Sequence, residues 1–422
     1  MGRTVVLEED ELNRLTASAR VGPYTGVLVG QTSEQKDFVV LIFPTPSLKE
    51  ITGGEKLTVD GDWWVEEHSK QVSRMLPGGL AVIGLLLCCP AEEFKSQQAR
   101  SRGLLLKMLT QSQSHGVVLH LCSKSRKYRF YAMDRTDSQS SLKPTEMKAQ
   151  AFASSWYKLE TSVVLDISVY TTGTKLEGLI QSSVQHILKG ISEALGTVNG
   201  QLCRGGQPIA KLCGDTQGVG VTVPAKLHIS KDSPSDPPTT VESSSLVKIG
   251  GRIKSYAYMN PKASCEETIS ALRCDLESSI LNRCRAFCED CQEEEDGDEK
   301  GKPKPASLQG GQLPRRVQVL LSTSPLLLTD YCFPDEDEEE CKSRVAELVG
   351  ADPSSITIQP LENFPLPPPS KVQTPCPSDT PSSSPLSAPP PANNQRVGVL
   401  PIAVGLAAIF IAILIWIMQT QS

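Results

Sequence analysis

The stretch MLPGGLAVIGLLLC, from Met75 to Cys88, decides the fold class of this chain. Leu80 to Cys88 is a continuous apolar run of strand length, as expected of a strand that is buried on both faces. The segment before it, Trp63 to Leu76, has a helical pattern that Pro77 must end, because the proline ring clashes with the preceding turn. The sequence therefore predicts a helix that turns directly into a buried central strand.

We call Met75, Leu76, Pro77, Gly78 and Gly79 the elbow. The two glycines can adopt positive φ without the steric penalty of a Cβ atom. We expect the elbow to fix how the Trp-bearing helix packs on the central sheet. On this interpretation it is a folding element, and it affects partner binding only indirectly.

Strands and helices intermix on both sides of this stretch. Leu176 to Val198 has apolar residues at helical spacing for about six turns, and Ala263 to Cys291 predicts another long helix. We expect an α/β fold in two lobes, with α+β as the alternative. Further strands are predicted at Thr4–Glu8, Thr25–Gln31, Phe38–Phe43, Val117–Cys122, Lys127–Met133, Tyr157–Tyr170, Leu246–Met259 and Val317–Leu321, and further helices at Glu9–Arg20 and Phe94–Leu109 and in a segment that ends at Val349.

Changes in composition divide the chain into five predicted segments. Gly200 to Thr240 is rich in Gly, Ser, Pro and Asp, which is typical of a flexible linker. Pro365 to Pro391 holds 11 Pro and 6 Ser, too few apolar groups to form a core, and predicts an extended tether. The segments are a leading domain at 1–199, a linker at 200–240, a second α/β lobe at 241–360, a Pro/Ser-rich tether at 361–396 and a transmembrane helix at 397–418.

The run VGVLPIAVGLAAIFIAILIWIM, from Val397 to Met418, contains no charged residue. As a helix it spans about 33 Å, enough for a hydrocarbon core of about 30 Å. A buried core helix is the alternative, but such helices are shorter and carry a polar face. We expect a membrane anchor marked by Val397, Gly405, Ala407, Trp416 and Met418, with Trp416 at the interface and small residues at helix-packing positions.

The surroundings of this run predict its orientation. Met1 to Asp10 contains no apolar signal-peptide core, and only Gln419 to Ser422 follow the run. These features predict a tail anchor that inserts after synthesis, with the bulk of the chain in the cytosol. The 13 cysteines are then expected to be reduced thiols.

Composition excludes several function classes. The formal charge is 42 − 48 = −6, which argues against a general nucleic-acid binder. Cysteine makes up about 3% of the residues, far below a disulfide scaffold. Two acidic runs, Glu289 to Glu299 and Asp335 to Glu340, are interpreted as solvated loops, with docking of a basic partner as the alternative.

One cysteine pattern resembles a metal site. Cys284, Cys288 and Cys291 have the Cys-x-x-x-Cys-x-x-Cys spacing that holds some iron–sulfur clusters, and a zinc or redox role is a further alternative. Free cysteine also behaves as a small buried hydrophobe. We expect plain core packing here, because seven residues lie on one helical stripe at steps of three and four: Cys265, Ile269, Leu272, Leu276, Ile280, Cys284 and Cys288.

Histidine offers little catalytic material. His68 lies on the same predicted helical face as Val65 and Val72, where a hydrogen-bonded core histidine is expected. His120 and Cys122 share one face of a predicted strand, but nothing around them resembles a protease signature. We predict no catalytic, metal or cofactor site, and no enzyme activity.

Several short motifs together resemble a known family. They are Leu28-Val29-Gly30-Gln31, Gln35-Lys36-Asp37, the stretch from Gln71 to Leu80, Ser155-Trp156 and Asp330-Tyr331. With the final apolar run, they resemble the family of the nematode odorant-response-abnormal protein four (odr-4), over nearly the whole chain. The Met-Leu-Pro-Gly-Gly stretch after a Trp-bearing helix is the most specific of them.

The resemblance implies a membrane-anchored accessory that helps seven-helix, G-protein-coupled receptors of the odorant type to leave the endoplasmic reticulum. It also implies an alternative, a scaffold that holds the ubiquitin-fold-modifier protease at that membrane in the pathway called ufmylation. It further implies that residues 1–199 are similar to the Mpr1/Pad1 N-terminal (MPN) metalloprotease fold. Active members have His-x-His after the second core strand, whereas Leu80 to Cys89 contains no histidine. A pseudo-enzyme that serves as a binding scaffold is therefore expected.

Overall fold

The computed structural model describes residues 3–17, 22–33, 35–47, 61–137, 141–171, 176–214, 218, 220–229, 245–296, 313–333 and 336–362. They all belong to one compact unit, Met1–Leu48 with Lys56–Pro365. The second unit, Lys49–Glu55 with Leu366–Ser422, lies outside the described residues. Most of the predicted tether and all of the predicted transmembrane helix fall in that second unit.

A closed seven-stranded barrel forms the first part of the fold, in the order β1-β3-β2-β4-β5-β6-β7, with β7 pairing back onto β1. The run that decided the fold class becomes β4, which is buried along almost its whole length and pairs in parallel with β5. The barrel strands are β1 Thr4–Leu7, β2 Tyr24–Thr32, β3 Lys36–Pro44, β4 Ala81–Cys89, β5 His115–Cys122, β6 Tyr128–Asp134 and β7 Lys143–Ala149, and the helices among them are α1 Glu9–Ala17, α3 Asp62–Met75 and α4 Ala91–Met108.

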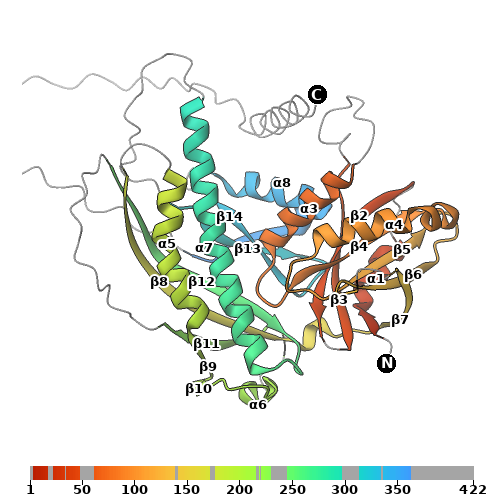
Figure 1. Ribbon diagram of the computed structural model, residues 1–422, viewed down its shortest axis with the longest axis horizontal. Helices are drawn as coiled ribbons and strands as arrows, with labels where there is room; N and C mark the ends of the chain where they lie inside the picture. Colours follow the sequence, from red (N-terminus) through yellow and green to blue (C-terminus); the bar gives the residue numbers. More distant parts are fainter. Residues whose placement is uncertain are drawn as a thin grey trace, which may run out of the picture. The chain divides into compact units, whose positions relative to one another are not determined.

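A five-stranded sheet follows, in the order β10-β9-β11-β8-β12. Two long helices, α5 and α7, lie side by side across one face of it (Figure 1). Its strands are β8 Tyr157–Thr171, β9 Leu195–Val198, β10 Gln201–Leu202, β11 Thr222–His228 and β12 Ser245–Met259, and its helices are α5 Leu176–Glu193, α6 Ala210–Cys213 and α7 Cys265–Asp296, after the short η1 Ala153–Ser155.

A third sheet has the order β14-β13-β15 and packs with α8 and α3. Asp337 and Glu340 form a capping box at the start of α8, so the second predicted acidic run partly serves to begin a helix. The elements are β13 Arg315–Leu321, β14 Leu327–Cys332, α8 Glu338–Val349, η2 Pro353–Ser355 and β15 Ile356–Pro360. Apolar residues of α3, β4, β13, β14 and α8 share one core cluster.

The mixed α/β class is confirmed, but two details of the prediction are wrong. The helix predicted to reach Val198 ends at Glu193, because residues 195–198 pair with β11 as strand β9. The predicted linker at 200–240 contains β10, α6 and β11 within its described part. Local composition missed β9 and β11 because these strands are stabilised by pairing with each other and, for β11, with β8, across long stretches of chain.

Strand pairing also groups the chain differently from the predicted boundary at residue 199. The predicted leading domain included β8 and α5, yet β8 pairs with β12 along its whole length and α5 packs on α7. The change from barrel to second sheet falls between β7 and β8.

The likeness of residues 1–199 to a metalloprotease-type fold stays a prediction. Among the helices of the described residues, none combines the length and the apolar character of a membrane span.

Candidate functional site

The elbow lies where the barrel meets the second sheet. Helix α3 ends at Met75, and Gly79 has a φ of +79°, a conformation that favours glycine. The Gly78 backbone N–H donates to the Tyr256 carbonyl (2.8 Å), and the Tyr258 N–H donates to the Gly78 carbonyl (2.9 Å). Gly78 therefore acts as a one-residue strand partner for the outer edge of β12.

Gly78 and Gly79 must both be glycine, because backbone carbonyl oxygens of other elements lie too close to leave room for a Cβ atom. A Cβ atom on Gly79 would lie 2.2 Å from the Tyr258 carbonyl oxygen, and one on Gly78 would lie 2.4 Å from the Ala271 carbonyl oxygen of α7. The sequence interpretation had the elbow set only the packing of α3. In the structure it also holds the barrel against β12 and α7.

Side chains complete the covering of this strand edge. The Lys254 N–H donates to the Glu362 carboxylate (2.7 Å), and the Tyr256 N–H donates to the Asp275 carboxylate (3.0 Å). Further along, Gln31 donates to the Tyr258 carbonyl (3.2 Å). We call the stretch of β12 from Lys254 to Tyr258 the capped edge. Its backbone groups are satisfied by residues from four distant parts of the chain, so no further strand can add there.

Two buried ion pairs hold the capping carboxylates. Arg316 of β13 forms two hydrogen bonds with Asp275, each 2.7 Å, and both side chains are 1% exposed. Arg283 of α7 pairs with Glu362 at 2.7 Å. Burial disfavours the charged form of Arg316, but Asp275, Tyr331 and Glu362 together outweigh this effect and raise the pKa of Arg316 above its ordinary value.

The ion pair also reaches the elbow. Arg316 donates to the Thr329 hydroxyl (3.0 Å), which donates to the Met75 carbonyl at the end of α3 (3.2 Å). The sequence analysis missed Asp275, Arg283 and Arg316. A signal was present, because the polar residues of α7 lie at helical spacing and are all buried: Thr268, Asp275, Ser279 and Arg283.

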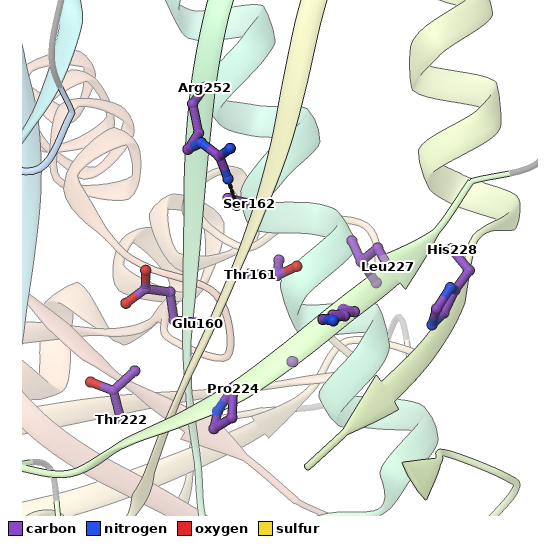
Figure 2. Close-up of a pocket in the computed structure, with 10 residues that line it drawn as sticks. Glu160, Thr161, Ser162, Thr222, Pro224, Leu227, His228 and Arg252 are labelled. Carbon is purple, nitrogen blue, oxygen red and sulfur yellow. Dashed lines mark hydrogen bonds between the residues drawn. The ribbon is translucent and has the colours of Figure 1, made fainter. Parts of the chain in front are cut away.

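The inner part of the second sheet has a different character. β11 pairs with β8 only over Thr222–Pro224, and with β9 over Ala225–His228. Figure 2 shows β11 running away from β8 beyond Pro224. We call the resulting gap the split groove. It has a volume of about 580 Å³ and is lined by Glu160, Thr161, Ser162, Thr222, Pro224, Ala225, Lys226, Leu227, His228 and Arg252.

The split groove is polar and open to solvent. Arg252 of β12 donates to the Ser162 hydroxyl (3.2 Å), as drawn in Figure 2. Glu160 pairs with Lys254 at 3.1 Å. Lys226 and His228 of β11 are exposed. Lys226 and Arg252 bring positive charge to the groove, and Thr161, Ser162 and Thr222 contribute hydroxyl groups to its lining.

The cysteine stripe is core, as predicted. All seven stripe residues are buried, and the Cys291 side chain lies outside those that the structure describes. Burial raises the pKa of Cys284 to about 12, so this thiol stays neutral at cellular pH. No group of three or more His, Cys, Asp or Glu side chains in the described residues could hold a metal ion.

The histidines singled out from the sequence have structural partners. The Nε2 atom of His68 donates to the Leu348 carbonyl (2.7 Å), joining α3 to α8, and Nδ1 lies 3.2 Å from the Thr45 hydroxyl. The Nε2 atom of His120 lies 3.1 Å from the Cys89 carbonyl oxygen, and its ring stacks on Phe94.

Cys122, two residues further along β5, has an unusual thiol. Its pKa is lowered to about 7, chiefly by a hydrogen bond from the Ser125 side chain.

Residues Val397, Gly405, Ala407, Trp416 and Met418 of the predicted anchor lie outside the described residues.

The family described as Odorant response abnormal 4-like matches residues 26–359, from β2 to β15. The chain belongs to this family. The Odorant response abnormal 4-like match includes the elbow, the capped edge and the split groove.

Relatives that carry the name Protein odr-4 homolog match most of the chain. The chain is 30% identical to the Mus musculus protein over 395 residues, covering 86% of each chain, and 29% identical to the Homo sapiens protein over 398 residues, again covering 86% of each. Among solved structures, UfSP from C. elegans aligns with a TM-score of 0.46 at 10% identity, covering 83% of this chain and 57% of UfSP. At that TM-score the two folds are only loosely alike.

Proposed function

We propose that this chain is a non-enzymatic accessory protein of the endoplasmic reticulum membrane that assists the folding, export or trafficking of seven-helix receptors. The observation that carries the proposal is membership of the Odorant response abnormal 4-like family over residues 26–359. The name of the family refers to odorant responses, and receptors of that sensory class cross the membrane seven times.

The described residues support a binding role. Several titratable side chains serve structural contacts: His68 joins α3 to α8, and Asp275 and Glu362 cap β12. Scaffolds expose surfaces for partners, and the split groove is such a surface.

The apolar run at 397–418 is proposed to anchor the chain, with the tether allowing the folded part to reach neighbouring membrane proteins. A chain truncated before Arg396 should remain in the supernatant when membranes are pelleted after a carbonate wash, whereas the full chain should pellet. A glycosylation sequon added after Ser422 should be modified, and one placed within 365–391 should not. Pelleting of the truncated chain after the wash would contradict the anchor.

The role itself is tested by receptor maturation. Cells that express a seven-helix receptor should, without this chain, retain the receptor in a form sensitive to endoglycosidase H. The full chain should restore the resistant form and the chain truncated before Arg396 should not. A single-pass glycoprotein is the control and should mature in both cases. Normal receptor maturation in the absence of the chain contradicts the proposal.

The alternative implied by the sequence resemblance is a scaffold for the ubiquitin-fold-modifier protease. The same cells distinguish it, because the fraction of that protease that sediments with membranes can be measured alongside receptor maturation. Loss of membrane-bound protease with unchanged receptor maturation would favour the scaffold over the trafficking accessory.

A further inference from the structure

We propose that the split groove binds an extended acidic peptide segment of a partner protein, which pairs as an added strand with β8. The inference stands apart from the proposed trafficking role, because it concerns what this surface of the second sheet can hold. It rests on the hydrogen-bonding directions of β8 and β11, on the floor of the groove and on its charge.

The first argument is the direction of the β8 backbone groups. In an antiparallel pair, opposed residues either bond each other or both face away. Lys254 of β12 bonds outward to Glu362, so its partner Ser162 must direct its N–H and C=O away from β12, into the split groove. Val164, opposite Arg252, follows the same alternation. Within the described residues, neither Ser162 nor Val164 has a backbone partner on that side.

The β11 wall presents the same opportunity. The Asn199 N–H donates to the Pro224 carbonyl (3.0 Å), so Pro224 faces β9. The alternate residues Ala225 and Leu227 therefore direct their backbone groups towards β8. Pairing between β11 and β8 stops at Pro224 and Glu160. Beyond this point the two strands face each other across the groove, and no backbone group of the described residues pairs with these donors and acceptors.

The floor of the groove is closed. Thr161 and Ala225 are buried, and Leu227 contacts both apolar clusters that lie between the sheet and its helices. An added segment would therefore lie in the plane of the sheet with its inner side chains on a preformed apolar surface. This is the geometry of strand addition, in which main-chain hydrogen bonds supply affinity and alternate side chains supply specificity.

Charge selects the class of partner. Arg252 and Lys226 are exposed at the groove, and no acidic side chain in the described part of the chain pairs with either. The one carboxylate at the groove, Glu160, is neutralised by Lys254. Val164 is 65% exposed beside them. A segment in which Asp or Glu alternates with β-branched residues matches both the charge and the strand geometry.

The test uses the full chain in detergent micelles and acetylated, fluorescein-labelled peptides of about ten residues. In these peptides Glu or Asp alternates with Val, Ile or Thr. Fluorescence anisotropy should show saturable binding below about 1 mM. Matched peptides with Lys in place of the acidic residues, or with N-methyl groups on alternate backbone nitrogens, should bind at least about tenfold more weakly.

Variants of the chain locate the site. The double variant Lys226→Glu with Arg252→Glu should weaken binding of the acidic peptides by about tenfold or more. Lys143→Glu, an exposed change on β7, is the matched control and should leave the dissociation constant unchanged. Hydrogen exchange of the wild-type chain gives a second readout that needs no variant, because bound peptide should protect the Ser162 and Val164 amides.

Four outcomes would overturn the proposal. They are the absence of binding by every acidic peptide, equal binding of the N-methylated peptides, an unchanged dissociation constant in the double variant, and unprotected Ser162 and Val164 amides at saturation. Vesicles of phosphatidylserine and phosphatidylcholine form a further arm. If they bind through Lys226 and Arg252 while the peptides do not, the groove contacts an anionic membrane and the peptide proposal is wrong.

Discussion

Two strand edges of the second sheet, the capped edge of β12 and the side of β8 that faces the split groove, differ in how their backbone groups are satisfied. At the capped edge of β12, the backbone groups bond to Gly78 and to the side chains of Gln31, Asp275 and Glu362. At the split groove, Ser162 and Val164 direct their backbone groups away from β12, and no described residue bonds to those groups from that side. The capped edge of β12 is closed by distant residues, whereas the β8 side of the split groove is not closed by any described residue.

The difference shows what closing an edge requires. Carboxylates that cap backbone N–H groups must themselves be buried, and a buried charge needs a partner. Arg316 and Arg283 supply those partners. The capped edge thereby ties the third sheet, α7 and the barrel to β12. Among the described residues, the exposed groove cations Lys226 and Arg252 have no ion pair of this kind, so these two side chains can change with little effect on folding.

The largest expected effect comes from removing a cation at the capped edge. Arg316→Met leaves the Asp275 carboxylate buried without its partner, which should lower the free energy of unfolding by about 3–5 kcal/mol. Chemical denaturation of the full chain in detergent measures this. Arg100→Met, which breaks an exposed pair with Asp62, is the matched control and should cost less than about 1 kcal/mol.

A second variant tests whether the loss of stability in Arg316→Met comes from the unpaired Asp275 carboxylate. Adding Asp275→Asn to Arg316→Met removes the uncompensated charge while leaving an oxygen to accept from the Tyr256 N–H. The double variant should therefore be more stable than Arg316→Met alone. If it is less stable, the cost of Arg316→Met does not come from a stranded carboxylate.

The elbow gives the next largest effect. Gly79→Val forces a β-branched residue into a positive φ and against the Tyr258 carbonyl, and should cost about 1–3 kcal/mol. Partner binding and thermal stability should fall together. Gly103→Ala in α4, where a Cβ meets nothing within 4 Å, is the control and should leave the melting temperature equal or higher. A Gly79→Val protein that melts like wild type yet loses its partner would make the elbow a contact surface.

His68, which joins α3 to α8, should make the free energy of unfolding depend on pH. Burial lowers the pKa of His68 below its ordinary value of 6.5, although the bond to Leu348 opposes the shift. The unfolded chain then binds a proton that the folded chain does not. The stability associated with neutral His68 is present above pH 6.5 and is lost as the pH falls towards the lower folded pKa.

Urea unfolding at a series of pH values from neutral to mildly acidic measures this loss. His68→Gln should reduce the slope of the free energy of unfolding by up to about 1.4 kcal/mol per pH unit below the unfolded pKa. Gln keeps a donor that can reach the Leu348 carbonyl, which makes it a conservative replacement. Identical slopes for the two proteins would show that His68 does not contribute.

The smallest effect is expected at the split groove. Arg252→Met removes an exposed guanidinium that, among the described residues, donates a hydrogen bond to Ser162. The change should alter the free energy of unfolding by less than about 0.5 kcal/mol. The contrast with Arg316→Met, the same substitution at the other edge, is the sharpest test of the comparison. Comparable losses in both variants would mean that the groove is as much a part of the folding core as the capped edge.

Much of the secondary structure could be predicted because it depends on neighbours in sequence. The apolar run at Leu80, the proline stop at Pro77 and the stripe from Cys265 to Cys288 all carry a local period that matches the observed elements. The anchor at 397–418 was equally clear as a pattern and lies outside the described residues. Helix α5 was overextended because residues 195–198 are apolar enough to continue the pattern, and only β11 makes them a strand.

The sequence by itself determined the mixed α/β class, the position of β4 and the end of helix α3 before Pro77, since these depend on periodicity and proline sterics. Tertiary structure alone decided that β8 joins β12, that Asp275 meets Arg316, and that β11 leaves β8 at Pro224. These contacts join residues tens of positions apart, and their energies come from strand pairing and from burial of charge. No local pattern records which distant partner satisfies a buried group, so both edges of the second sheet became visible only in the folded chain.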